Sequence, residues 1–324
     1  MIVTITANPS LDRTYQVDSL QPGAVNRASL DTVEASGKGV NVSRVLTAAG
    51  VDTLAVTMAG GAEGEQLVRL LVAGAVPHRA HRATATTRTN VTVLGPTGVT
   101  TKVNAAGEPP SAADLDALLD LTAGCVAPGD WLVIAGTEPP GPYRLTERAI
   151  AVAHAAGARV AVDTSGSPLA AAHTAGADLL APNNGELADL LGERASALPD
   201  PVDRAIADAR TLIEGAALPA LLVSLGEHGA IYAAGQAAWH AVAPSVVPVN
   251  TAGAGDALLA GFLGTGGDIP ARLARAVAWG TAACQRPETA GDVSSADPTT
   301  VRVRTVTDPG KTDLDPSSDQ QEAS

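Results

Sequence analysis

The sequence has few cysteines and few aromatic residues. Two cysteines in 324 residues exclude a disulfide-stabilised scaffold, and neither has the CxxC or CxxH spacing of a zinc site. Apolar runs such as residues 216–223 are much shorter than the about 20 residues of a membrane-spanning helix, so no membrane partner is expected. The first residues, MIVTITANPS, lack the basic segment and cleavage site of an export signal. These absences favour a cytoplasmic protein.

Positive charge is also scarce, because the formal net charge is −13 and only three of the 21 basic residues are lysines. Proteins that bind nucleic acid usually carry clustered Lys and Arg, so we expect no nucleic-acid partner. Residues 306–324 hold five acidic residues, one Lys and no aromatic residue, which predicts a disordered acidic tail.

From about Trp131 onward, short β-branched runs alternate with segments of helical periodicity, the pattern of parallel strands joined by crossover helices. Strands are predicted at WLVIA (131–135), RVAVD (159–163), ADLLAP (177–182) and ALLVSL (220–225). Helices are predicted at 143–156, 167–174, 185–191 and 201–215. This part of the chain therefore predicts an α/β fold with a doubly wound, mostly parallel sheet.

The first third has a different pattern, with short strands separated by turns that contain Gly or Pro. After a strand at 2–6, strands are predicted at 15–17, 28–33, 89–94 and 100–104, with helices at 40–49 and 63–73. We expect these short strands to pair antiparallel and to leave the main sheet as a small flap. Flaps often cover substrates.

The most informative motif is NTAGAGDALLAGFL (250–263), a Gly-rich turn between a predicted strand, VVPV (246–249), and an apolar helix. Backbone N–H groups and the helix dipole make such a turn an anion site. Asp256 is placed to accept a proton from a hydroxyl beside a bound phosphate. An ordinary turn with Asp256 as helix N-cap is an equally simple interpretation. Leu258 excludes the GxGxxG motif, and no GxxxxGK[ST] motif occurs.

Two further turns carry candidate ligands. In ASGKGVNVSR (35–44), a glycine turn opens a helix, and its backbone and Asn41 offer donors for sugar hydroxyls; the alternative is a C-cap and N-cap pair between two elements. In PNNGE (182–186), Asn183 and Glu186 form a candidate outer-shell site for Mg²⁺ and its waters. A capping box explains the same two residues without a metal.

Nine segments in register resemble the ribokinase-like (PfkB) carbohydrate kinases, and most nearly the 1-phosphofructokinases and tagatose-6-phosphate kinases. They are ANPSLD (7–12), GAVNR (23–27), GKGVNVSRVL (37–46), TRTN (87–90), PPG (139–141), VDTSG (162–166), PNNGEL (182–187), VSLGEHGA (223–230) and TAGAGDALLAGF (251–262). The resemblance covers roughly residues 2–293. It implies a ribokinase-like kinase domain at 1–305, with flap strands within about 13–34 and 87–104, ahead of the tail at 306–324.

The resemblance implies that MgATP phosphorylates a phosphorylated ketohexose, most directly fructose 1-phosphate to fructose 1,6-bisphosphate. The alternative acceptors are tagatose 6-phosphate and fructose 6-phosphate. A catalytically inactive regulator that binds a sugar phosphate is the alternative from another class, and a nucleoside kinase is a third reading. The resemblance also implies a homodimer through the flap, although the sequence by itself leaves the oligomeric state open.

The family's functional residues map onto matching positions of this chain. Asp256 would be the catalytic base, with Gly253, Ala254 and Gly255 as the anion hole. The residues that would hold the sugar phosphate are Asp12, Arg27, Gly37, Lys38, Asn41, Arg88, Asn90, Lys102, Asn104 and Thr137. The residues that would hold ATP are Asn183, Ser224, Gly226, Gly229 and Thr251, and Glu186 would bind Mg²⁺ through water.

Charge supports a phosphorylated acceptor, because a sugar phosphate needs fixed cations. Arg27, Lys38, Arg88 and Lys102 are the candidates, and Arg27 and Lys102 also fit the alternative of a solvated surface residue. Four positions depart from the family pattern, and their effect on the substrate is open. Ser36 replaces a glycine and restricts φ there, Glu138 adds a carboxylate near the expected phosphate, Lys102 stands where the subgroup often has Glu, and Ala181 replaces a Lys.

Overall fold

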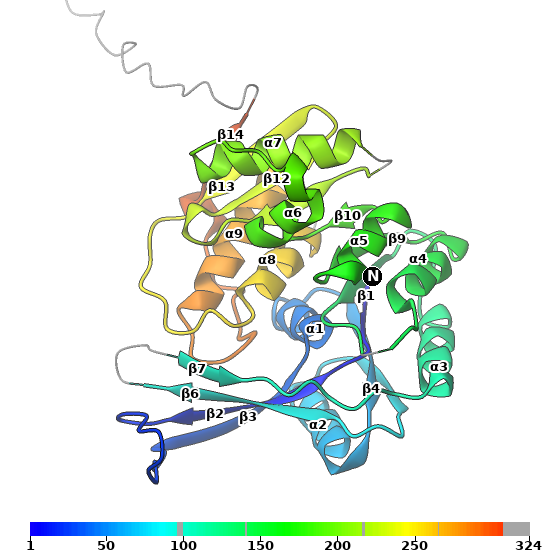
Figure 1. The fold of residues 1–324 in the computed structure, drawn as a ribbon, viewed down its shortest axis with the longest axis vertical. Coiled ribbons are helices and arrows are strands. Elements are labelled where there is room, and N and C mark those ends of the chain that lie inside the picture. Colours follow the sequence, from blue (N-terminus) through cyan, green and yellow to red (C-terminus); the bar gives the residue numbers. More distant parts are fainter. Residues whose placement is uncertain (96–99, 140, 216–217, 265, 307–324) are drawn as a thin grey trace, which may run out of the picture.

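A ten-stranded sheet separates two layers of helices (Figure 1). The computed structural model describes residues 1–95, 100–139, 141–215, 218–264 and 266–306. In spatial order the sheet contains β14 (Arg302–Thr305), β13 (Ala237–Val242), β12 (Ala230–Ala234), β11 (Leu221–Ser224), β10 (Leu179–Leu180), β9 (Arg159–Asp163), β8 (Trp131–Ala135), β1 (Ile2–Thr6), β4 (Thr53–Ala59) and β5 (His78–Arg82). The strands from β11 to β5 are parallel, and β12, β13 and β14 pair antiparallel at one edge.

Both faces of the parallel strands are apolar, because each face is covered by helices. In β8, Leu132 and Ile134 enter one core, whereas Val133 and Ala135 enter the other. The first core is closed by α3 (Ala112–Ala123), α4 (Leu145–Ala155), α5 (Ser167–Thr174), α6 (Asn184–Leu191) and α7 (Pro201–Glu214). The second is closed by α1 (Lys38–Ala48), α8 (Ala254–Leu263) and α9 (Ile269–Cys284). This is the doubly wound α/β core that the sequence predicts.

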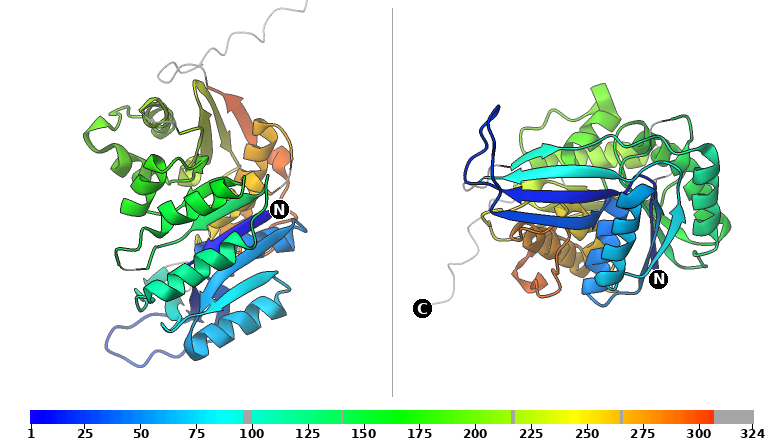
Figure 2. Two further views of the ribbon diagram at one scale, coloured as in Figure 1. Left: turned by 90° about the vertical axis from the view of Figure 1, so that its right-hand side faces the viewer. Right: turned by 90° about the horizontal axis from the view of Figure 1, so that it is seen from below.

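The flap is a separate four-stranded sheet on one side of this body (Figure 2). Its order is β3 (Leu30–Ser36), β2 (Ser10–Gln16), β6 (Arg88–Leu94) and β7 (Thr100–Val103). The register places Asp12 of β2 between Glu34 of β3 and Asn90 of β6. At the base of the flap, α2 (Gly61–Ala73) packs Leu67 and Leu71 in one cluster with Leu11 and Ala35.

Several predicted elements are corrected. The flap is not wholly antiparallel, because β2 and β6 run parallel. Its first two strands, β2 and β3, lie within residues 10–36 rather than within 13–34. The VVPV run forms no strand: Val247 is 87% exposed, and Pro248 has no N–H for a sheet ladder. The strand predicted at 177–182 keeps only two residues before Pro182. The predicted disorder of the tail falls on residues 307–324, outside the described part of the chain.

Within the described ranges, no helix is both long enough and apolar enough to cross a lipid bilayer.

Candidate active site

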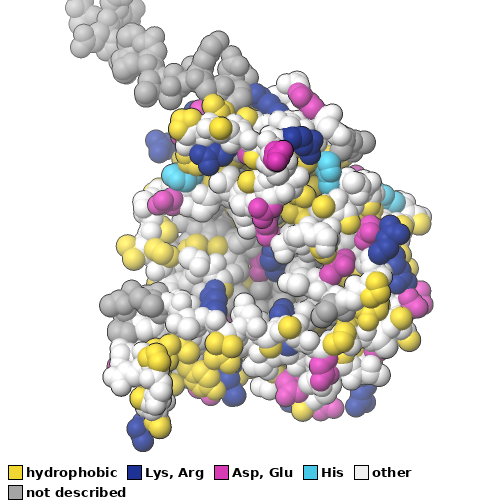
Figure 3. Space-filling view, viewed as in Figure 1, with side chains coloured by type: hydrophobic (Ala, Val, Ile, Leu, Met, Phe, Trp, Pro, Cys, Tyr) yellow, Lys and Arg dark blue, Asp and Glu magenta, His cyan; other side chains and the backbone are white. Residues whose placement is uncertain are grey.

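Two cavities meet at the carboxyl ends of the parallel strands, which is where α/β sheets bind ligands. The first cavity, about 500 Å³, lies between the flap and the sheet, and the second, about 420 Å³, lies beside α8 and α9. They share Ser224, Gly255 and Leu258. Figure 3 shows the first cavity as a hollow between the upper body and the flap, with basic and acidic side chains both visible in it.

All but one of the predicted site residues line these cavities. The first cavity is lined by Asp12, Gly37, Lys38, Asn41, Arg88, Asn90, Lys102, Asn104, Thr137, Asn183, Glu186, Ser224, Gly253, Gly255 and Asp256. The second is lined by Ser224, Gly226, Gly229, Thr251, Ala254 and Gly255. The exception is Arg27, which lies in the exposed connection between β2 and β3 and lines neither cavity. The prediction for Arg27 rested on a local motif, which carries no information on the distance between this connection and the cavity.

Residues 251–255, the anion-binding turn, lead into α8. Gly253 is the N-cap residue and has φ +79°, a left-handed conformation that favours glycine. A Cβ there would also lie 2.9 Å from the nitrogen of Ala290. Because Gly253 and Gly255 line the first cavity, the amino-terminal end of α8 faces it. The N–H groups at this helix start and the helix dipole can therefore bind an anion in the cavity.

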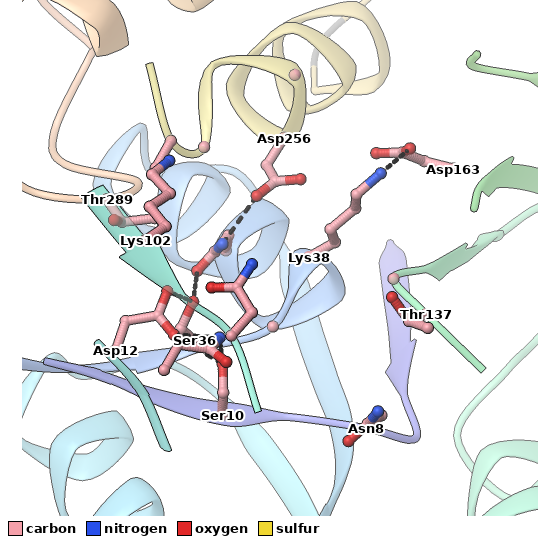
Figure 4. Close-up of a pocket in the computed structure, with 18 of the residues that line it drawn as sticks. Asn8, Ser10, Asp12, Ser36, Lys38, Lys102, Thr137, Asp163, Asp256 and Thr289 are labelled. Carbon is pink, nitrogen blue, oxygen red and sulfur yellow. Dashed lines mark hydrogen bonds and ion pairs between the residues drawn. The ribbon is translucent and has the colours of Figure 1, made fainter. Parts of the chain in front are cut away.

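Asp256 lies in the first turn of α8 and is 5% exposed. Asn41 of α1 donates a hydrogen bond of 2.8 Å from Nδ2 to its Oδ2 (Figure 4). Burial and the nearby carboxylate of Asp163 raise the pKa of Asp256 to about 7, while Lys38 and the Asn41 hydrogen bond act in the opposite direction. Asp256 is not the N-cap, so the capping interpretation of this motif is wrong.

Lys38 and Asp163 form an ion pair in the same cavity, with 2.6 Å between Nζ and Oδ1 (Figure 4). Burial by itself would lower the pKa of Lys38, but the Asp163 carboxylate raises it above its usual value. Asp163 was not predicted as a site residue. It is the last residue of β9, and ligands of α/β proteins bind at the carboxyl ends of parallel strands, so its position was a signal that could have identified it. The Asp163 carboxylate raises the pKa of both Lys38 and Asp256.

The flap contributes an ordered carboxylate, Asp12. Ser10 Oγ and Asn90 Nδ2 donate to Asp12 Oδ1 over 2.8 and 2.9 Å, and Ser36 Oγ donates to Oδ2 over 2.7 Å. Ser36 does not have a positive φ, so serine fits this position without backbone strain and supplies a hydroxyl that glycine lacks. The expected disturbance of the turn by Ser36 is therefore not found.

Arg88 of β6 is held by backbone carbonyls. Its Nη1 donates to Ala105 over 2.7 Å and its Nη2 to Asn8 over 3.3 Å, while Nε is buried with no hydrogen-bond partner. Burial lowers the pKa of Arg88, and Asp12 opposes this. No salt bridge to Arg88 occurs in the described residues. An anion in the first cavity would compensate for the burial of this charge.

The other departures from the family pattern have different outcomes. Glu138 lines neither cavity: its Oε1 accepts hydrogen bonds from the N–H and Oγ1 of Thr146, both at 2.6 Å, at the start of α4. The extra carboxylate is thus turned away from the cavity, contrary to the expectation. Lys102 and Ala181 both line the first cavity.

Asn183 and Glu186 form the capping box that was the alternative explanation for this pair. Asn183 Oδ1 accepts from Glu186 N–H, and Glu186 Oε2 accepts from Asn183 N–H, each over 2.9 Å. Both residues also line the first cavity. Across the residues described by the structure, no group of three or more His, Cys, Asp or Glu side chains is arranged to hold a metal ion.

The second cavity is mainly apolar. Its lining includes Pro244, Val246, Pro248, Leu258 and Val277. The misassigned VVPV segment therefore forms a wall of this cavity rather than a strand of the sheet. An apolar slot that opens beside the anion-binding turn suits a ligand with a flat ring at one end and phosphates at the other.

Comparison with known proteins agrees with this geometry. The sequence profile of the "pfkB family carbohydrate kinase" matches residues 5–296. A 1-phosphofructokinase of Rhodobacter capsulatus is 34% identical over 266 residues, which cover 81% of this chain and 82% of the relative. The ATP-dependent 6-phosphofructokinase isozyme 2 of Escherichia coli is 34% identical over 269 residues, which cover 80% of this chain and 83% of the relative.

The fold has the same relatives. The crystal structure of phosphofructokinase-2 from Escherichia coli in complex with fructose-6-phosphate superposes with a TM-score of 0.82 and 30% identity, over 91% of this chain and 97% of the other. The ribokinase-like α/β fold with a small separate sheet is thereby confirmed. From the family match and these relatives, the chain belongs to the pfkB family of carbohydrate kinases.

Proposed function

We propose that this kinase transfers the γ-phosphoryl group of MgATP to the free primary hydroxyl of a phosphorylated ketohexose, with fructose 1-phosphate as the leading acceptor. Fructose 6-phosphate and tagatose 6-phosphate are the alternative acceptors. The observation that carries the proposal is the position of Asp256, a buried carboxylate beside the anion-binding turn, where the two cavities meet.

In this mechanism Asp256 accepts the proton of the attacking hydroxyl. The carboxylate must be ionised to do so, and the Asn41 hydrogen bond holds it in one orientation. The attacking oxygen displaces ADP in line, and the charge on the transferred group is stabilised by N–H groups of Gly253, Ala254 and Gly255. Lys38 is a fixed cation in the same cavity.

The sugar phosphate would occupy the first cavity. Asp12, Asn41 and Asn90 suit its hydroxyls, whereas Arg88, with its buried unpartnered Nε, and Lys102 suit its phosphate. The remaining predicted residues Gly37, Asn104 and Thr137 also line this cavity and would complete the sugar site.

The nucleotide would place its base in the second cavity, near Gly226, Gly229 and Thr251, and its phosphates toward the anion-binding turn. Asn183 and Ser224 line the passage. The capping box uses Oε2 of Glu186, and no cluster of carboxylates surrounds Glu186 within the described residues. Glu186 would therefore hold Mg²⁺ through a water molecule rather than directly. When bound, Mg²⁺ would neutralise charge on the nucleotide phosphates.

We extend the proposal to the organisation of the protein: one kinase domain at 1–305, followed by an acidic tail, and a cytoplasmic location. A homodimer through the flap is supported by exposed apolar side chains on the flap and its connecting loop. They are Leu20, Val25, Leu30 and Val103.

The direct test measures ADP release from MgATP with fructose 1-phosphate, fructose 6-phosphate, tagatose 6-phosphate, fructose and adenosine. Turnover of one phosphosugar would support the proposal and name the acceptor. Turnover of fructose or adenosine alone would contradict the assignment to a phosphorylated acceptor. Phosphosugar binding without any turnover would instead favour the non-catalytic regulator.

The pKa of Asp256 predicts the pH dependence of the reaction. Because the raised pKa is about 7, kcat/KM should increase with pH and reach its plateau above about pH 8. The phosphate of the sugar itself titrates at about pH 6, so a control is needed. Asn41→Leu removes a hydrogen bond that lowers the pKa of Asp256, so the midpoint should move to higher pH. A midpoint that stays in place would assign the titration to the substrate.

The two glycines of the anion-binding turn should respond differently to alanine. Gly255→Ala meets no atom within 4 Å, so the variant should fold with an unchanged Tm while its methyl group enters the phosphate site and lowers kcat about 10- to 100-fold. Gly253→Ala strains a positive φ and meets Ala290, which should cost about 1–3 kcal/mol of unfolding free energy. Thermal unfolding and kcat of both variants check this; equal losses of Tm would contradict it.

A further inference from the structure

A half-buried carboxylate that lines neither cavity joins the flap to the C-terminal part of the chain. Glu34 of β3 accepts a hydrogen bond from Arg44 Nη2 to Oε1 over 2.6 Å and another from the N–H of Thr289 to Oε2 over 3.0 Å. The Glu34 and Arg44 side chains are 14% and 20% exposed. Arg44 Nη1 also donates to the carbonyl of Ala35 over 2.9 Å, so the guanidinium is fixed on β3.

The segment that Glu34 holds supports the anion-binding turn. A Cβ on Gly253 would lie 2.9 Å from Ala290 N and 3.2 Å from Thr289 Cγ2, so these residues pack directly against the turn. Asn250 links the two segments, because its Nδ2 donates to the Pro287 carbonyl over 3.0 Å. Ala290 has a φ of 55°, an unfavourable value that persists only where the surroundings hold the backbone.

The same stretch of β3 also orders the proposed sugar site. Glu34 stands opposite Asp12 in the register of β2 and β3, and Ser36 donates to the Asp12 carboxylate. A displacement of β3 would therefore disturb Asp12 in the first cavity and Thr289 beside the anion-binding turn together. No other hydrogen bond or salt bridge between β3 and residues 285–296 is found in the described part of the chain.

We propose that Glu34 is a positioning residue that couples the flap to the anion-binding turn, so that phosphosugar and nucleotide each bind more tightly when the other is present. The inference rests on the proposed function, in which the flap holds the phosphosugar and the turn holds the γ-phosphoryl group. The coupling requires that the Glu34 contacts favour one arrangement of the flap over another, because such a contact links the two binding equilibria reciprocally.

The test measures the Kd of the non-hydrolysable nucleotide AMP-PNP with Mg²⁺, with and without saturating fructose 1-phosphate. In the wild-type protein the phosphosugar should tighten AMP-PNP binding at least about fivefold. In Glu34→Gln this ratio should fall close to one, and kcat should fall about 10- to 100-fold, while the Kd of each ligand alone stays within about twofold. A purely structural role would lower Tm without changing the ratio.

Asp31→Asn is the matched control. Asp31 lies on the same strand and pairs with Arg13 at 3.1 Å, but both side chains are exposed and neither lines a cavity. Its ratio should remain that of the wild type. Glu34→Asp serves as a second variant, because it keeps the charge beside Arg44 but is too short to reach both partners.

The outcomes separate the two ideas. A ratio close to one in every Glu34 variant that folds, with Asp31→Asn unchanged, supports the coupling. An active wild type whose ratio is one, or an unchanged ratio in either folded Glu34 variant, overturns the coupling and leaves the proposed function intact. A wild type that turns over no phosphosugar overturns both.

Discussion

Asp256→Asn should lower kcat by about 10²- to 10⁴-fold, the contribution of a general base, while the protein still binds phosphosugar and nucleotide. Asparagine has the size of aspartate and can accept the hydrogen bond from Asn41, so the site keeps its shape. Only the capacity to accept the substrate proton is lost. Steady-state ADP release together with calorimetric binding of each ligand measures the two properties separately. Unchanged turnover would exclude Asp256 as the base.

The same variant should be more stable than the wild type at neutral pH. The folded-state pKa of Asp256 is raised, so the unfolded chain binds fewer protons at this group than the native state between about pH 4 and pH 7. The contribution of Asp256 to stability therefore decreases as pH rises through that window, and an asparagine side chain, which does not titrate, has no such loss. The Tm difference between variant and wild type should grow from pH 4 to pH 7.

Asp208→Asn is the matched control for this prediction. Asp208 of α7 is also buried, but it lines neither cavity. Burial raises the pKa of Asp208, although the hydrogen bond from the Ser196 N–H and the charge of Arg204 act in the opposite direction. Relative to the wild type, this variant should gain stability with rising pH in the same sense and keep the wild-type kcat. Loss of turnover in Asp208→Asn would indicate that removal of a buried charge, rather than of a base, reduces activity.

Arg88→Met should lower kcat/KM for the accepting phosphosugar by about 100- to 1000-fold, mostly through KM. Arg88 lines the first cavity, and the Ala105 and Asn8 carbonyls hold its guanidinium in place there. Loss of two charged hydrogen bonds between Arg88 and the substrate phosphate corresponds to about this factor. Kinetics with the phosphosugar and with unphosphorylated fructose, measured side by side, test the effect, because a substrate without the phosphate should be affected much less.

Arg13→Met provides the comparison on the same sheet. Arg13 is an exposed flap arginine that lines neither cavity, and its removal should leave both substrates unaffected. Equal losses for fructose and its phosphate in Arg88→Met would show that Arg88 supports the flap rather than the phosphate. Arg27→Met, measured alongside, tests the sequence-based prediction for a residue that lies outside both cavities.

Much of the fold follows from local patterns. Strands β8 and β9 have the predicted bounds because strands buried on both faces read as continuous apolar runs. Strand β5, with the sequence HRAHR, lies at the edge of the sheet and has no such run, so the pattern contains no signal for it. VVPV has the signal of a strand without the burial of one, since Val247 faces solvent.

For the site, the turn at Gly253 and the helix behind it could be predicted, because N–H groups at a helix start are set by the local backbone. Asp256 does not cap α8, because the helix begins after Gly253; its carboxylate instead accepts a hydrogen bond from Asn41, which is 215 residues away in the chain. Glu138 has the residue type of a site carboxylate, but it accepts hydrogen bonds from Thr146 at the start of a helix eight residues later. The link between Glu34 and Thr289 spans 255 residues and leaves no motif.

The sequence by itself therefore determined the α/β class, the alternation of strands and helices between residues 131 and 225, and the anion-binding turn, since each depends on periodicity or on the backbone of adjacent residues. The tertiary structure decided which side chains share a cavity, which carboxylates have a raised pKa and which arginine is partly buried beside the cavity. These properties depend on burial and on neighbours that are distant in the chain, because desolvation and Coulomb interactions are set by proximity in space.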